Sequence, residues 1–287
     1  MNFSEFFESI GVPAFGTKVC EPVNCGAGLA IEDGISGGAD DSYMVVIGDV
    51  TPKMFRDFLA SLASSGRKET FHREVNGNIF SEFVEENRII YTYFTREAEQ
   101  ARVIIDNASC PLSEMNDNEP DVRGDTALMQ FSLKYGSMVR YHSCDCGMLY
   151  VLRLRDNSVI IIDGGEIEQA TEEACDEFMR RLEDLTNTEK GGKIRIAAWI
   201  CTHNHDDHMD VFTKLLKREK DILCVERLMF NFPSRTLLDY SSGCTDRLRE
   251  RLKKYAPNAK YLKLHTGQTV HFPDSYLEVL TTHEDIL

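Results

Sequence analysis

The sequence predicts an α/β protein built of two domains, and three observations lead to this prediction. Segments of strand length, with alternating or continuous apolar residues, occur in both halves of the chain beside longer segments with a helical period. Residues 107–126 break both patterns with Asn, Asp, Ser, Pro and Gly. The length of 287 residues fits about two domains of ~100–200 residues each. We therefore expect a small acidic α+β domain over residues 1–106, a linker over 107–126 and a second domain over 127–287.

In the first domain the expected order is a strand, a helix and then further strands. The run SYMVVIGDV is continuous enough for a buried strand. The helix that follows has Thr51 as its N-cap, Pro52 in its first turn and Gly66 as its stop signal. The segments KETFHREV, NIFSEFVEEN and RIIYTYFTRE then alternate as strands do, with VNGN and EENR as turns.

The second domain begins with paired strands and continues with alternating helix and strand. We expect strands at ALMQFSLKY and MVRYHSCDCG, and a hairpin formed by MLYVLRLRDNS and VIIIDGG. A helix is expected over residues 168–187, where Ala170, Ala174, Phe178 and Leu182 recur at four-residue steps. The apolar run KIRIAAWICT then predicts a strand whose carboxyl end carries a cluster of histidines, and DVFTKLLKRE predicts the next helix.

Composition limits the classes of partner and compartment. Residues 1–126 hold 22 of the 47 acidic residues but 10 of the 32 basic ones, and a negative field of this kind disfavours nucleic acid as a partner. No apolar run reaches the ~18 residues of a membrane span, and the N-terminus lacks the pattern of a signal peptide, so a cytoplasmic protein without membrane contact is expected. The nine cysteines form no zinc-ribbon pattern, and Cys144 and Cys146 are expected to be ordinary thiols. The composition leaves open whether the chain forms a homo-oligomer.

The densest chemistry lies in CTHNHDDHMD, residues 201–210, which contains three of the eight histidines. Side chains two apart on an extended segment point the same way, so His203 and His205 are expected to converge on one ion. Asp207 and His208, on the following turn, are expected to converge on a second position close by. This ligand set suits zinc first, with iron or manganese as alternatives. A polar loop without any metal is the competing interpretation.

These residues resemble a known signature, because THNHDDH is similar to the H-x-H-x-D-H motif of the metallo-β-lactamase superfamily. VIIIDGG resembles the strand and Asp-x-Gly segment that precedes the motif in that superfamily, and the order of elements follows the family from about residue 127 onward. Residues 1–126 resemble no family. The resemblance implies an αββα sandwich with one or two metal ions in a shallow groove. It also implies that Asp163 supports the metal-binding loop.

The function that the resemblance implies is metal-dependent hydrolysis of an ester, amide or phosphodiester bond in a small-molecule substrate. A bound divalent cation lowers the pKa of water from 15.7 towards ~7, so hydroxide becomes available at neutral pH. His203 and His205 would hold one ion, and Asp207 and His208 the other. Asp207 would also orient the hydroxide, which makes it the expected catalytic residue.

The sequence departs from the family pattern after this motif. The family continues with a further His, a bridging Asp and a last His, whereas this sequence offers His265, His271 and His283. His283 is the expected further ligand because it follows the predicted strand YLEVL, while His265 and His271 are expected at the surface. No segment resembling the second half of the sandwich follows, so the sandwich is expected to be incomplete at the C-terminus. The alternative function is a catalytically inactive binding or scaffold module with the same fold.

Overall fold

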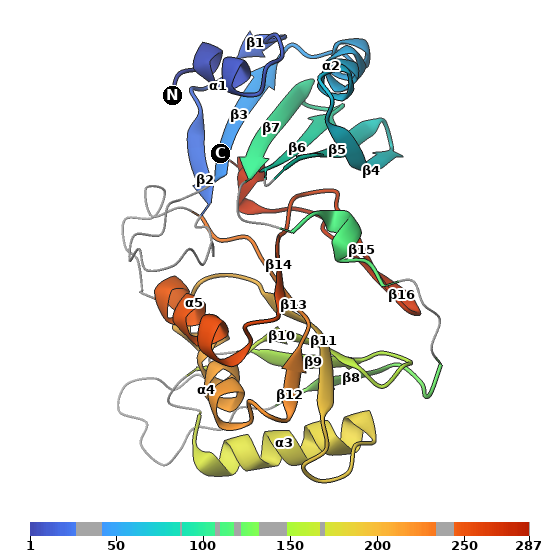
Figure 1. Cartoon of the computed structure of the whole chain (residues 1–287), viewed down its shortest axis with the longest axis vertical. Helices are drawn as coiled ribbons and strands as arrows, with labels where there is room; N and C mark the ends of the chain where they lie inside the picture. Colours follow the sequence, from blue (N-terminus) through green and yellow to red (C-terminus); the bar gives the residue numbers. More distant parts are fainter. Residues whose placement is uncertain are drawn as a thin grey trace.

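The computed structural model describes residues 1–26, 42–86, 88–106, 110–117, 122–131, 148–166, 170–233 and 244–286. These residues form an α/β protein with two seven-stranded sheets and a two-stranded hairpin. The sheets lie one beyond the other along the longest axis of the molecule (Figure 1). The predicted α/β class is confirmed, and each of the two sheets belongs to a different half of the chain.

The N-terminal sheet is antiparallel throughout. Its strands follow the order β1-β3-β7-β6-β5-β4, and β2 pairs with β3. The tight turn between β4 and β5 uses Asn76 and Gly77, both with positive φ, as the predicted VNGN turn requires. The strands are β1 (Thr17–Lys18), β2 (Val23–Gly26), β3 (Ser42–Gly48), β4 (Lys68–Val75), β5 (Asn78–Glu85), β6 (Arg88–Thr95) and β7 (Gln100–Asp106).

Two helices, α1 (Phe3–Ser9) and α2 (Pro52–Ser64), pack on one face of this sheet. Helix α2 begins as predicted, because the Thr51 hydroxyl accepts a hydrogen bond from the Met54 amide at 3.2 Å. The rings of Phe7 and Phe58 contact each other edge to face in the core between helices and sheet. Burial of such aromatic side chains is the main contribution that holds the helices on the sheet.

The C-terminal sheet is mixed, with the order β14-β13-β11-β10-β9-β8 and β12 paired to β11. β10, β11, β13 and β14 are parallel, so their carboxyl ends meet at one edge. The predicted hairpin is present as the antiparallel pair of β9 and β10. The strands are β8 (Ala127–Gln130), β9 (Leu149–Arg153), β10 (Val159–Asp163), β11 (Ile194–Cys201), β12 (Leu223–Val225), β13 (Arg227–Phe230) and β14 (Lys260–Lys263). The predicted strand MVRYHSCDCG, with Cys144 and Cys146, lies outside the described residues.

The two faces of the C-terminal sheet are covered differently. Helices α3 (Glu172–Thr186), α4 (Asp210–Arg218) and α5 (Cys244–Tyr255) share one core with one face. The hairpin of β15 (Thr269–Phe272) and β16 (Ser275–Glu278) packs on the opposite face together with the 3₁₀ turn η1 (Leu112–Glu114). Within the described residues this half of the chain therefore has one large sheet, and the two-stranded hairpin is the sheet that faces it.

Residues 110–117 of the predicted linker pack against the C-terminal sheet, whereas residues 122–126 are mostly exposed. Leu112 and Met115 are buried in the core on the hairpin side of the C-terminal sheet. The chain meets the N-terminal sheet between β14 and β15, where the Tyr91 hydroxyl donates to the Thr266 carbonyl at 2.9 Å, and again after β16, where Arg102 donates to the Glu284 carbonyl at 3.0 Å. The C-terminus lies beside that sheet in Figure 1. Among the described residues there is no helix of the length and apolarity that crossing a bilayer takes.

Candidate metal centre

The histidine motif forms the connection between β11 and α4. β11 ends at Cys201, residues Asp206–His208 form the 3₁₀ turn η3, and α4 starts at Asp210. The neighbouring parallel strand β10 ends at Asp163, so this aspartate lies at the same edge of the sheet as the motif. The carboxyl ends of parallel strands are where open α/β folds bind ligands.

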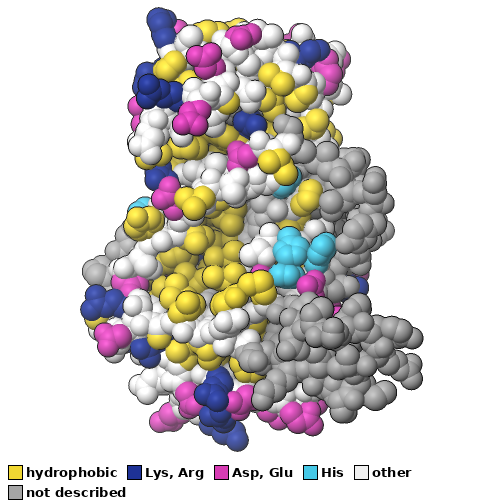
Figure 2. Space-filling model, turned by 180° about the vertical axis from the view of Figure 1, so that it is seen from behind, with side chains coloured by type: hydrophobic (Ala, Val, Ile, Leu, Met, Phe, Trp, Pro, Cys, Tyr) yellow, Lys and Arg dark blue, Asp and Glu magenta, His cyan; other side chains and the backbone are white. Residues whose placement is uncertain are grey.

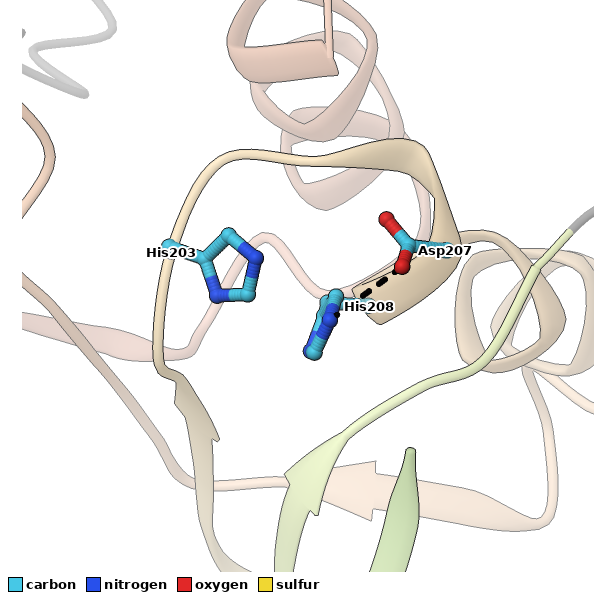
Figure 3. Close-up of side chains that lie close together, drawn as sticks. All are labelled: His203, Asp207 and His208. Atoms are coloured by element: carbon cyan, nitrogen blue, oxygen red, sulfur yellow. Dashed lines mark ion pairs between the residues drawn. The ribbon is translucent and has the colours of Figure 1, made fainter. Parts of the chain in front are cut away.

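Three side chains of the motif converge. One donor atom from each of His203, Asp207 and His208 lies within 4.8 Å of the other two. The Nε2 atom of His208 is 3.3 Å from Oδ2 of Asp207, and the rings of His203 and His208 are 3.9 Å apart between centroids. The three side chains point towards a common space inside the loop (Figure 3).

This grouping differs from the predicted division into two ion positions. His203 groups with Asp207 and His208, and the structure does not bring His205 into that group. His205 is exposed, although its ring lies 4.7 Å from that of His203. The chain bends at residues 202–204, directly after β11, so the extended geometry on which the pairing of His203 with His205 depended is not present. The 3₁₀ turn that follows places Asp207 and His208 beside His203.

The structure does not bring His283 to these side chains either, which corrects the expected further ligand. The Nε2 atom of His283 donates to the Cys25 carbonyl at 2.7 Å, on β2 of the N-terminal sheet. The physical reason is that the chain after β16 forms the 3₁₀ turn η4 (His283–Ile286) against that sheet rather than returning to the edge that carries the motif. The predicted surface position of His265 is wrong, since this side chain is buried, while that of His271 is confirmed.

Asp163 supports the loop as expected. Its carboxylate accepts hydrogen bonds from the Thr202 amide and hydroxyl, each at 2.9 Å, and from Nδ1 of His208 at 2.9 Å. Asp163 has a φ of 60°, a backbone conformation that is uncommon outside glycine, at the point where the strand turns into the loop. The adjacent Gly164 allows α4 to approach, because a Cβ there would lie 2.6 Å from that of Phe212.

The hydrogen bonds determine which ring nitrogens are free to bind a cation. A carboxylate only accepts, so Nδ1 of His208 and the Thr202 hydroxyl both donate to Asp163. The Thr202 oxygen then accepts from Nδ1 of His203 at 3.0 Å. Both neutral rings therefore have the lone pair on Nε2, which is how a partner at one ring nitrogen usually prepares the other for a metal. The role of Thr202 was not predicted from the sequence, although this residue directly precedes His203.

The two histidines differ in their affinity for protons. Burial lowers the pKa of His203, and the neighbouring His208 and His205 lower it further. Burial also acts to lower the pKa of His208, but the hydrogen bond and charge of Asp163 and the charge of Asp207 outweigh it, so this pKa is raised. A carboxylate on each side thus favours a positive charge at His208.

The donor set fits a divalent cation. With Nδ1 protonated, the lone pair of His208 faces the Asp207 carboxylate across 3.3 Å, and two acceptors tolerate this contact only with a proton or a cation between them. Two imidazole nitrogens and one carboxylate oxygen are a ligand set of catalytic zinc sites, which leave one position for water. Figure 2 shows a group of histidine side chains at the surface, directly beside a broad apolar area.

A scan against models of known protein families found no match for this chain, and a search of curated proteins found none either.

Proposed function

We propose that this chain is a metal-dependent hydrolase in which His203, Asp207 and His208 hold one divalent cation, with Zn²⁺ as the first choice and Fe or Mn as alternatives. The observation that carries the proposal is the shared hydrogen-bond network of Asp163. Its carboxylate takes the Nδ1 proton of His208 directly and orients that of His203 through Thr202. A single buried carboxylate thereby prepares two ring nitrogens for coordination.

The bound cation would supply activated water by lowering its pKa to about 7. Asp207 is suited to orient that water, because its side chain is partly exposed beside His208. Asp163 and Thr202 keep the two imidazoles in one tautomer and one orientation, so little rearrangement is needed when substrate arrives. The bond hydrolysed is proposed to be an ester, amide or phosphodiester of a small molecule.

The proposal extends to the fold. We propose that residues 127–287 form the first half of a metallo-β-lactamase-like αββα sandwich. Helices on one face of a mixed sheet, and a motif loop at the carboxyl edge next to Asp163, support this assignment. These two features and the sequence resemblance are those expected of the first half of such a sandwich.

Zinc titration followed by calorimetry tests the metal site. We expect one Zn²⁺ per chain and no measurable binding by His208→Ala or His203→Ala, because each loses one of three ligands. His271→Ala is the matched control, since this histidine is exposed on β15 and lies outside the group. Equal zinc binding by His208→Ala and the unmodified chain would contradict the proposed site.

Hydrolysis of chromogenic esters, lactams and phosphodiesters with added Zn²⁺ or Mn²⁺ then tests turnover. We expect activity that Asp207→Asn removes. Zinc binding without hydrolysis of any of these bonds would instead favour the second candidate, a binding or scaffold module. The observation behind this second candidate is the half-covered face of the C-terminal sheet, where Leu128 is 69% exposed and Leu152 is partly buried.

A further inference from the structure

A second group of titratable side chains lies where the chain after β14 meets the N-terminal sheet, and the proposed metal site does not use it. His265 is at its centre, with Asp106 from the end of β7 and Glu284 from η4 on either side. All three side chains are at most 1% exposed. Buried ionisable groups of this kind are costly unless they are paired, so their arrangement calls for a physical reason.

The geometry around His265 needs both ring nitrogens to be protonated. Nδ1 lies 3.0 Å from the Glu284 carboxylate and Nε2 lies 3.7 Å from Oδ2 of Asp106. The ring also stacks on Tyr91 at 4.8 Å between centroids. A neutral imidazole has one N–H and would turn a lone pair towards one of the two carboxylates. The imidazolium is therefore the form that donates a hydrogen bond to Glu284 and at the same time places a positive charge 3.7 Å from Asp106.

The two carboxylates belong to parts of the chain that are far apart in sequence. Asp106 is on the N-terminal sheet, whereas Glu284 follows the hairpin that packs on the C-terminal sheet. Further hydrogen bonds connect the same two parts of the chain. Arg102 donates to the Glu284 and Asp285 carbonyls at 3.0 and 3.1 Å, and the Tyr93 hydroxyl donates to Asp285 at 2.7 Å. The cluster thus fastens one segment across one face of the N-terminal sheet.

We propose that protonated His265 is a latch that holds residues 264–286 on the N-terminal sheet, and that loss of its proton releases this segment. Other contacts of the segment with that sheet surround the latch, including the bonds of Tyr91, Tyr93 and Arg102 described above. Arg73 pairs with Glu278 at 2.7 Å, and Gly267 packs so closely on Phe80 that a Cβ at this glycine would lie 2.1 Å from the ring. The latch is the most deeply buried of these contacts.

Several of the groups that face His265 have shifted pKa values, and burial raises that of the Glu82 carboxyl. The charges of Glu284 and Asp106 outweigh burial and raise the pKa of His265 to about 9. Burial raises the pKa of the Cys25 thiol to about 12 and that of Tyr91 well above its usual value, while burial lowers the pKa of His283. The titratable and charged groups around His265 are Cys25 on β2, Glu82 on β5, Tyr91 on β6, Arg102 and Asp106 on β7, Lys263 on β14, and His283, Glu284 and Asp285 on η4.

Hydrogen–deuterium exchange of the full chain over a pH series tests the latch. Protection of peptides from residues 264–286, corrected for the intrinsic exchange rate, should fall about tenfold per pH unit between about 6.5 and about 9 and then level off. Peptides from α3, which lies on the far side of the C-terminal sheet core, should keep their protection over the same range. His265→Gln should show low protection of the segment throughout, and His271→Gln should behave like the unmodified chain.

Two results would overturn the latch. One is flat protection of residues 264–286 from pH 6.5 to 9, and the other is an equal fall in α3, which would mean global unfolding rather than release of a segment. Should His265→Gln fail to fold, Asp106→Asn decides the matter together with the unmodified chain. Losing one carboxylate lowers the proton affinity of His265, so the fall in protection should end at a lower pH than in the unmodified chain.

Discussion

Two histidines in this molecule, His208 and His265, each lie between two carboxylates, and they differ in access to water. His208 has Asp163 at Nδ1 and the partly exposed Asp207 at Nε2. His265 has Glu284 and Asp106, and both of these side chains are fully buried. At His208 a cation from solution can replace the proton between ring and carboxylate, whereas at His265 the proton stays enclosed. The same arrangement of groups thus surrounds the proposed metal ligand His208, which has a partly exposed neighbour, and the fully enclosed ion pair of His265.

The largest expected effect is the loss of stability when His265, the buried histidine of the two, is replaced. His265→Ala removes the imidazolium between the buried Asp106 and Glu284, while Lys263 stays 3.9 Å from Glu284. Removing one partner of a buried ion pair costs about 3–5 kcal/mol of the free energy of unfolding. Denaturant unfolding at neutral pH measures this loss. The exposed His271→Ala should stay within about 0.5 kcal/mol of the unmodified chain. A loss at His265 no greater than at His271 would contradict the ion pair.

The pH dependence of the free energy of unfolding tests the same buried pair of His265 and Glu284. The pKa of His265 is raised to about 9, so its contribution is complete below 6.5 and is lost as the pH rises through about 9. The pKa of Glu284 is lowered to about 2 because the charge of His265 outweighs burial, so its contribution is present above 4.5 and is lost as the pH falls through about 2. Unfolding measured over a pH series should show the pair contributing most between 4.5 and 6.5. His265→Gln should flatten the alkaline side.

A smaller effect is expected at Asp163, on which the orientation of His208 depends. Asp163→Asn keeps the size of the side chain but replaces one acceptor oxygen with a donor amide, so His208 and Thr202 lose a common acceptor. Changes of this type lower metal affinity by about 10–100-fold. Zinc calorimetry measures the change, with Asp156→Asn as a control aspartate on the hairpin turn away from the loop. Unchanged zinc affinity in Asp163→Asn would contradict the proposal that Asp163 fixes the ring tautomers of His203 and His208.

The smallest expected effect is at Thr202, which acts on His203 through one hydroxyl. Thr202→Val keeps the shape and removes the bridge between Asp163 and Nδ1 of His203, so zinc affinity should fall by up to about tenfold. Thr202→Ser retains the hydroxyl and should bind zinc like the unmodified chain. A larger loss in the serine variant than in the valine variant would show that packing, and not the hydroxyl, is responsible.

What the sequence could predict of this fold is what neighbouring residues decide. Thr51 and Pro52 start a helix through local hydrogen bonding, and Asn76–Gly77 turn a hairpin through backbone conformation alone. His203, Asp207 and His208 lie within six residues, so their convergence depends on one short turn. An alternating pattern could not show that the chain bends at residues 202–204, so the grouping of His203 with Asp207 and His208 was not predicted.

The rest could not be predicted because it depends on contacts across most of the chain. His283 bonds to the carbonyl of Cys25, and His265 pairs with Asp106, through a packing of the segment after β14 on the first sheet. No local period or spacing near either histidine encodes that neighbour. A histidine that follows a predicted strand looks the same in sequence whether the chain then returns to its own sheet or crosses to another.

The crossing of residues 264–286 to the N-terminal sheet also sets an order of events during synthesis. Tyr91 and Arg102 find their partners at Thr266 and Glu284, which leave the ribosome long after the strands that carry them. Until then the described segment that packs over Tyr91, Tyr93 and Ile104 on one face of the first sheet has not been synthesised. The sheet that is translated first is therefore completed last, and such long-range closure makes folding slow.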